Sequence, residues 1–185
     1  MHSITRGLIC LIPVLVLAGC ETTNSIPYKA STTNVLTVQQ KLQTQNRKVQ
    51  LGTVAMAPGV EEHLLCRLSG EVKVAPGKTL PQYIKEAFQE ELFMAQAYAT
   101  DAPAIITGTV DKIGFSSVAP AFWEISMSVK SNFSPGYQVS TKYVFNTSWT
   151  AYSACKNVAD AFAPAVQDLL KEVVNHPGFA NLAEH

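Results

Sequence analysis

Regular alternation of apolar and polar residues runs through most of the chain from Ala104 to Trp149. In its middle part, single polar residues separate Trp123, Ile125, Met127 and Val129. Successive side chains of a β-strand point to opposite faces of the sheet, so this pattern puts the large residues on one face. Ser134-Pro135-Gly136 supplies a turn between two segments. The stretch therefore predicts three consecutive antiparallel strands with an apolar face that helices must cover.

Other segments extend this sheet. Val49–Met56 alternates and ends at Pro58-Gly59, and a second extended segment covers Leu65 to Val74 before Pro76-Gly77. Within the first of the three later strands, the apolar positions change parity near Asp111-Lys112, which predicts a β-bulge. We therefore expect four to five strands in one sheet.

A helix is predicted after the second turn. Thr79-Leu80-Pro81-Gln82 has Thr79 as an N-cap and Gln82 as the partner that completes a capping box, with a proline in the first turn. Apolar residues then recur at helical spacing, and we expect this helix to end near Tyr98.

A second helix is predicted from about Lys156 to Val174. Pro164 lies inside it and predicts a kink or a restart near Phe162-Ala163. Strands and helices together predict an α+β fold, with a single antiparallel-rich sheet of four to five strands and two helices packed on one face.

The N-terminus has the layout of a secretory signal. Arg6 gives the positive flank, and the apolar run from Leu8 to Ala18 is shorter than the roughly 20 residues that cross a bilayer. Leu17-Ala18-Gly19-Cys20 resembles the lipobox of bacterial lipoproteins. That resemblance implies a diacylglycerol on the Cys20 sulfur, removal of residues 1–19 and acylation of the new amino terminus. The alternatives are an ordinary cleaved signal and an uncleaved anchor.

Attachment at Cys20 has a physical consequence. One acyl chain holds a protein weakly and two or more hold it firmly, since each buried methylene contributes about 0.8 kcal/mol. Lipoproteins of this class with an Asp after the cysteine stay at the inner membrane. Here the residue is Glu21, so the resemblance implies the outer membrane, with the protein facing the periplasm.

Between Cys20 and about Arg47 the chain is rich in Thr, Asn, Ser, Gln and Lys. A segment with so little apolar surface predicts a flexible tether, although Val35-Leu36 and Leu42 could support a short helix. The predicted organisation is a signal peptide over 1–19, a lipidated cysteine with tether over 20–47, and a periplasmic α+β domain over 48–185.

Two cysteines remain for the folded domain. Cys10 leaves with the signal and Cys20 takes the lipid, so Cys66 and Cys155 are left in a compartment where disulfides persist. An even remainder favours one disulfide, and the alternative is two separate buried thiols.

Several short sequences in the domain resemble a family of uncharacterised proteobacterial lipoproteins. They are Cys66-Arg67, Gly77-Lys78-Thr79, Tyr83-Ile84, Phe115-Ser116-Ser117, Ala154-Cys155 and Ala161 to Leu169. The layout also resembles the small α+β lipoproteins of the Gram-negative envelope, such as the lipopolysaccharide-assembly lipoprotein and the auxiliary lipoproteins of lipid ABC transporters. This resemblance implies location and fold and assigns no activity.

Charge and metal-ligand patterns exclude several function classes. The 14 basic and 14 acidic residues balance, so no basic face for nucleic acid is expected. The sequence has no C-x-x-C motif, and the four histidines (His2, His63, His176 and His185) show no ligand spacing. We predict no metal site and no cofactor.

No group of residues predicts catalysis. The adjacent pair Glu90-Glu91 is expected to be solvated, Ser116-Ser117 to lie in a turn without a nucleophile elbow, and Asp101 to belong to a turn. His176 is expected at a helix C-terminus, where it interacts with the dipole. Trp123 and Trp149 could line a ligand groove, but alternation places both on the covered face of the sheet.

Two functions follow from these expectations, with an unrecognised hydrolase as a third and less favoured alternative. The first is a non-catalytic, lipid-anchored module that partners an envelope protein, for which an exposed sheet edge would offer a docking surface. The second is a carrier of a small apolar ligand or lipid, held between the sheet and its helices. A cavity there would favour the carrier, whereas a filled core with an exposed apolar patch would favour the module.

Overall fold

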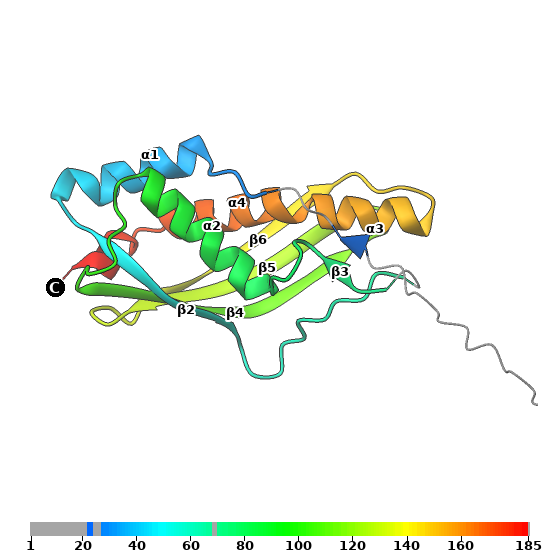
Figure 1. Cartoon of the computed structure of the whole chain (residues 1–185), viewed down its shortest axis with the longest axis horizontal. Helices are drawn as coiled ribbons and strands as arrows, with labels where there is room; N and C mark the ends of the chain where they lie inside the picture. The colour runs from blue at the N-terminus through cyan, green and yellow to red at the C-terminus, as the bar shows by residue number, and fades with distance from the viewer. Residues whose placement is uncertain (1–21, 24–26, 68–69, 185) are drawn as a thin grey trace, which may run out of the picture.

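A computed structural model describes residues 22–23, 27–67 and 70–184 (Figure 1). A four-stranded sheet forms one layer, with strand order β2-β4-β5-β6. Its strands are β2 (Val49–Met56), β4 (Ala104–Ser116), β5 (Ala121–Ser131) and β6 (Tyr137–Phe145). The helices lie together on one side of this sheet (Figure 1). The predicted α+β class and four strands are confirmed.

The sheet is mixed. β4–β5 and β5–β6 pair antiparallel, as the alternation predicted, whereas β2 pairs with β4 in parallel. The chain between β2 and β4 includes helix α2 (Leu80–Met94), and this crossover lets the chain re-enter the sheet in the same direction. The predicted bulge is confirmed, since the β4–β5 register shifts between Val110 and Lys112.

Helix α2 begins as its sequence predicts. The Thr79 side chain accepts a hydrogen bond from the Gln82 amide, and the Gln82 side chain accepts one from the Thr79 amide. The helix ends at Met94, a turn before the predicted Tyr98, with Gln96 at a positive φ of 57° just beyond it.

The last predicted helix is two helices in succession. α3 (Ala151–Asp160) and α4 (Phe162–Asn175) meet at Ala161, so the predicted restart near Phe162-Ala163 is confirmed. α3 begins earlier than the predicted Lys156, because the Thr150 side chain caps the helix by accepting from the Ser153 amide.

Residues 27–47 do not form the predicted flexible tether, and the short helix that Val35-Leu36 and Leu42 could support is present instead. Helix α1 (Thr32–Lys41) and a 3-10 turn (η1, Gln43–Gln45) lie there, and α1 rests against α2 and α4 (Figure 1). Val38 and Leu42 are fully buried. These two apolar side chains pack against helices that are distant in the sequence. Their burial offsets the entropy lost when the segment becomes ordered, which its polar composition alone had suggested it could not do.

The second extended segment is also shorter than predicted. Among the described residues of this segment, only β3 (Val72–Lys73) is a strand, and it pairs in parallel with β1 (Thr22–Thr23) in a separate two-stranded sheet. The chain around it forms an irregular loop that a disulfide holds. Cys66 and Cys155 are bonded, with their Cα atoms 5.8 Å apart. The predicted bridge is therefore present and ties this loop to α3.

Within the described residues, no helix combines the length and the apolar character that crossing a membrane would need. The signal sequence and Cys20 lie outside the described residues, so their predicted roles stay predictions.

Candidate functional site

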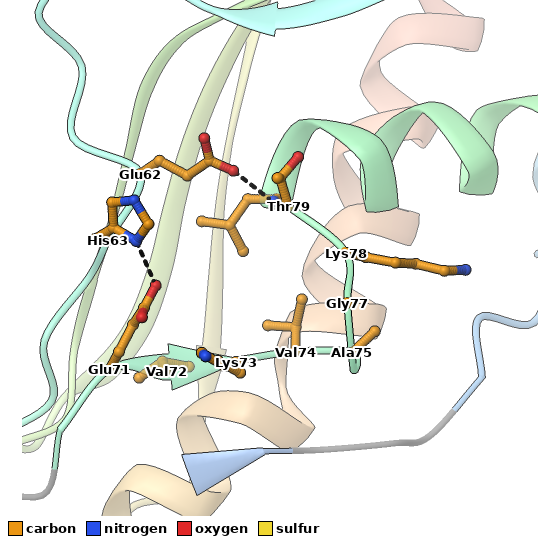
Figure 2. A pocket seen from close by; sticks show the side chains of 11 residues that line it. Glu62, His63, Glu71, Val72, Lys73, Val74, Ala75, Gly77, Lys78 and Thr79 are labelled. Carbon is orange, nitrogen blue, oxygen red and sulfur yellow. Dashed lines mark hydrogen bonds and ion pairs between the residues drawn. The ribbon is translucent and has the colours of Figure 1, made fainter. Parts of the chain in front are cut away.

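A shallow groove lies where the loop before α2 folds back on β3 (Figure 2). Glu62, His63 and Glu71 line one side, and Lys78 and Thr79 line the other. The His63 Nδ1 and a Glu71 carboxylate oxygen are 2.7 Å apart, and this contact raises the pKa of His63. Glu62 accepts a hydrogen bond from the Leu80 amide at 3.1 Å, so it occupies the N-terminal end of α2.

The groups in this groove already have partners. His63 is paired with Glu71, Glu62 with the Leu80 amide, and Lys78 with Glu86. Thr79 is engaged in the helix cap. These ion pairs and the capping hydroxyl stabilise the loop. Among the described residues of the groove, no nucleophile lies beside a base.

Ser116 ends strand β4, and Asp101 and His176 lie in a turn and at a helix end, respectively. The Ser116 hydroxyl accepts from the Val118 amide at 3.3 Å, and the position of Asp101 is as predicted. His176 is the C-cap of α4, as predicted, but its Nδ1 accepts from the Gly178 amide at 3.0 Å and its ring stacks on Tyr137. Its contacts are those of a turn former.

The prediction for Glu91 is wrong. Glu90 is exposed, but Glu91 is fully buried between α1 and α2. Its Oε1 accepts hydrogen bonds from the Tyr28 hydroxyl at 2.7 Å, the Asn34 side-chain amide at 3.0 Å and the Ser31 amide at 3.2 Å. Oε2 has no partner among the described residues. Burial raises the pKa of Glu91 above its ordinary value, and the three hydrogen bonds oppose that change.

The two tryptophans have opposite environments. Trp123 is fully buried as predicted, with its ring centroid 4.9 Å from that of Phe162 and 5.0 Å from that of Phe115. Its indole N–H donates to the Val158 carbonyl at 2.8 Å. The space between sheet and helices at this point is filled by side chains, and its one polar group is satisfied.

Trp149 does not lie on the covered face, because β6 ends at Phe145 and the residue belongs to the loop before α3. Its side chain is fully exposed. With Val118 and Arg67 it borders a mostly apolar hollow, which Ala119, Thr147 and Ser148 complete. The Arg67 guanidinium donates to the Ser117 carbonyl at 2.8 Å and to the Trp149 carbonyl at 3.3 Å, which fixes the two loops together.

The sheet also presents an uncovered face and an edge. The uncovered face carries polar groups, with an ion pair between Lys112 and Glu124 and a hydrogen bond between the Ser126 and Ser140 hydroxyls, and also the exposed apolar side chain of Val144. β2 and β6 are the two edge strands, and no strand of the described residues pairs with the outer side of β6. Its nine residues leave a row of backbone groups available to an added strand.

Within the described ranges, no three His, Cys, Asp or Glu side chains gather closely enough to hold a metal ion.

No protein-family model matches the sequence, and no curated protein matches it. Among solved structures, the chain is similar to a Xanthomonas campestris protein with the family model DUF330, with a TM-score of 0.52 and 10% identity over 83% of this chain and 91% of that one. A second similar structure, of an uncharacterized protein, has a TM-score of 0.40 and 11% identity over 82% and 99% of the two chains. At such low identity, the similarity to the Xanthomonas campestris protein shows the fold alone and says nothing about activity.

Proposed function

We propose that this chain is a non-catalytic lipoprotein of the bacterial envelope, anchored through Cys20 in the outer membrane and facing the periplasm, where it serves as an accessory module for another envelope protein. The lipobox-like sequence Leu17–Cys20 supports the anchor. The fold shared with a proteobacterial protein is consistent with this setting.

The packing of the core around Trp123 favours an interaction module over a carrier. A carrier of an apolar ligand would need space between the sheet and the helices, and Trp123, Phe115 and Phe162 occupy that space with ring centroids about 5 Å apart. The apolar groups that remain for binding are therefore on the outside of the domain, as around Trp149.

The outer edge of β6 suits a protein partner. A strand from another protein could add to this edge by main-chain hydrogen bonds, and the exposed side chains of Gln138, Ser140 and Lys142 would contribute selectivity. Lys142 lies over the Phe122 ring, 4.0 Å from its centroid, so the edge carries a positive charge beside an aromatic surface.

Site-specific photo-cross-linking in intact cells tests this function. A photoreactive amino acid at Ser140, exposed on β6, should give one discrete adduct with an envelope protein. Phe93 is exposed on the last turn of α2, on the other side of the domain, and is the matched control position. Cys20→Ala should abolish acyl labelling and the adduct together. A labelled, correctly localised protein with no adduct at Ser140 would reject this docking edge.

The carrier remains the alternative. Native mass spectrometry of the purified lipidated protein measures it directly, because a bound lipid or small molecule would add a defined mass beyond that of the acylated chain. Such a mass, persisting without any protein adduct, would favour the carrier.

A further inference from the structure

The start of the folded chain lies close to the predicted anchor. Thr22 pairs with Val72 and Thr23 with Lys73, which holds β1 to β3. Cys20 precedes Thr22 by two residues, so their Cα atoms are at most about 7 Å apart. Tyr28, whose hydroxyl is hydrogen-bonded to buried Glu91, gives a second limit on the position of Cys20. The two residues are eight positions apart, so their Cα atoms are at most about 28 Å apart. With a lipid on Cys20, the acyl chains would therefore enter the bilayer beside β1.

β1 identifies which end of the domain faces the lipid. It lies next to α3 and β3, at the opposite end of the molecule from the C-terminus (Figure 1). β4 ends and β5 begins at the same end as the loop before α3, because Arg67 contacts both Ser117 and Trp149. The turn between β5 and β6, which contains Phe133, lies about 35 Å away along the 11-residue strand β5.

The end beside β1 carries large exposed apolar groups. Trp149 is fully exposed, and Val118, Tyr152 and Leu65 are 61%, 69% and 71% exposed. Val118 and Trp149 border one hollow, Tyr152 lies in the first turn of α3, and Leu65 precedes the cysteine that is bonded to α3. We call these four residues together with Arg67 the tip patch.

The composition of the tip patch matches a membrane interface. Trp and Tyr are enriched at the headgroup level because their rings are apolar and their tips polar. Arg67 adds a positive charge suited to lipid phosphates, and none of the described residues that line the hollow beside it is acidic.

We propose that the tip patch lies in the headgroup region of the bilayer that holds Cys20, so that the domain stands on this end and β6 extends away from the membrane. This inference deepens the proposed function and rests on its lipid anchor. Only two residues separate Cys20 from the β1 residue paired with Val72, and the orientation of the docking edge follows from this short distance.

Tryptophan fluorescence of the full lipidated protein tests the proposal. The protein is reconstituted into vesicles of phosphatidylethanolamine and phosphatidylglycerol, with and without brominated acyl chains. The sequence has two tryptophans, and buried Trp123 supplies a constant background. We expect the Trp149 emission to shift to shorter wavelength on vesicles and to lose most of its intensity with brominated lipid. Trp149→Phe should remove both changes.

A relocated tryptophan is the matched control. In Trp149→Phe/Phe133→Trp the second indole sits in the turn at the far end of the domain, and bromine should leave its emission unchanged. Equal quenching at positions 149 and 133 would overturn the proposed orientation.

Flotation of the vesicles separates the two levels of the proposal. Protein that floats with the vesicles while Trp149 stays unquenched would overturn the tip patch and leave the anchor intact. A blue shift at Trp149 without quenching would show a protein contact there and would also overturn the membrane contact. Failure to float would overturn the anchor itself, and the tip-patch proposal with it.

Discussion

The Tyr28 hydroxyl donates a 2.7 Å hydrogen bond to the carboxylate of Glu91, a residue 63 positions later in the chain. Asn34 donates to the same oxygen and also to the Gln167 carbonyl, so Glu91 joins the N-terminal segment to α2 and Asn34 joins it to α4. Burial, with the Glu91 charge and hydrogen bond, raises the pKa of Tyr28 well above its usual range. This cluster holds α1 against the domain.

Removal of the Glu91 carboxylate should loosen the N-terminal segment. Glu91→Ala leaves two side-chain donors and one backbone donor without their acceptor, so we expect the free energy of unfolding to fall by about 2–3 kcal/mol. Limited proteolysis should cut residues 27–47 faster. Glu90→Ala is the control, because Glu90 is exposed and accepts one backbone hydrogen bond, from Ala30. Similar effects of the two variants would contradict a structural role for the buried carboxylate.

Glu91 should also give stability a pH dependence of a definite sign. Burial raises its pKa above 4.5, so the folded protein binds this proton more tightly than the unfolded chain. Its contribution to the free energy of unfolding therefore falls as pH rises from about 4.5 through the raised pKa of the folded state. Glu91→Gln cannot titrate and retains an oxygen acceptor.

Urea unfolding of both proteins over this pH range measures the effect. We expect wild type to lose stability relative to Glu91→Gln as the pH increases, with the smallest difference at the acidic end. A stability difference that stays constant with pH would show that Glu91 has the same pKa in the folded and unfolded states.

Loss of the disulfide should destabilise the domain strongly. The bridge closes a loop with a sequence separation of 89 residues, for which the chain-entropy model gives about 4–5 kcal/mol. Cys66→Ser/Cys155→Ser should show this loss in chemical unfolding. A reductant should destabilise wild type by a similar amount and leave the double variant unchanged, and an equal response of the two would argue against the bridge.

Gly136 should tolerate no side chain. It has a φ of 79°, and a Cβ there would come within 1.7 Å of the Val129 carbonyl oxygen. We expect Gly136→Ala to cost roughly 3 kcal/mol or more, because the β5–β6 turn must shift. Gly114→Ala on β4 is the control, since a Cβ there meets no heavy atom within 4 Å. Thermal unfolding should show a large loss of Tm for the first variant and little change for the second.

Local features of the fold could be predicted because their causes lie within a few residues. The Thr79–Gln82 capping box, the bulge beside Val110 and the helix restart before Pro164 each depend on neighbouring side chains or a single ring. The buried environment of Trp123 followed from strand alternation. The same rule failed for Trp149, because the strand ends at Phe145 and alternation has no meaning beyond it.

The candidate site depended on contacts that alternation cannot reveal. The pattern of α2 predicts a solvated Glu91, and only Tyr28 and Asn34 cover it. The exposed tip around Trp149 depends on two loops, 50 and 82 residues after Arg67 in the chain, that Arg67 holds together. One local signal was present, since Glu91 is four residues after Ala87 and one before Leu92, on the buried side of α2.

The sequence by itself determined the antiparallel strands β4 to β6, the start of α2 and the restart at α4, because side-chain period, capping chemistry and a proline specify them. It favoured a bond between the two remaining cysteines without excluding two free thiols, and the structure decided for the bond. Tertiary structure decided that β2 joins the sheet in parallel, that α1 docks where a tether was expected, and that Glu91 is buried while Trp149 is exposed. Each of these features is stabilised by contacts with residues that are distant in the sequence. Those contacts exist only once the chain has folded.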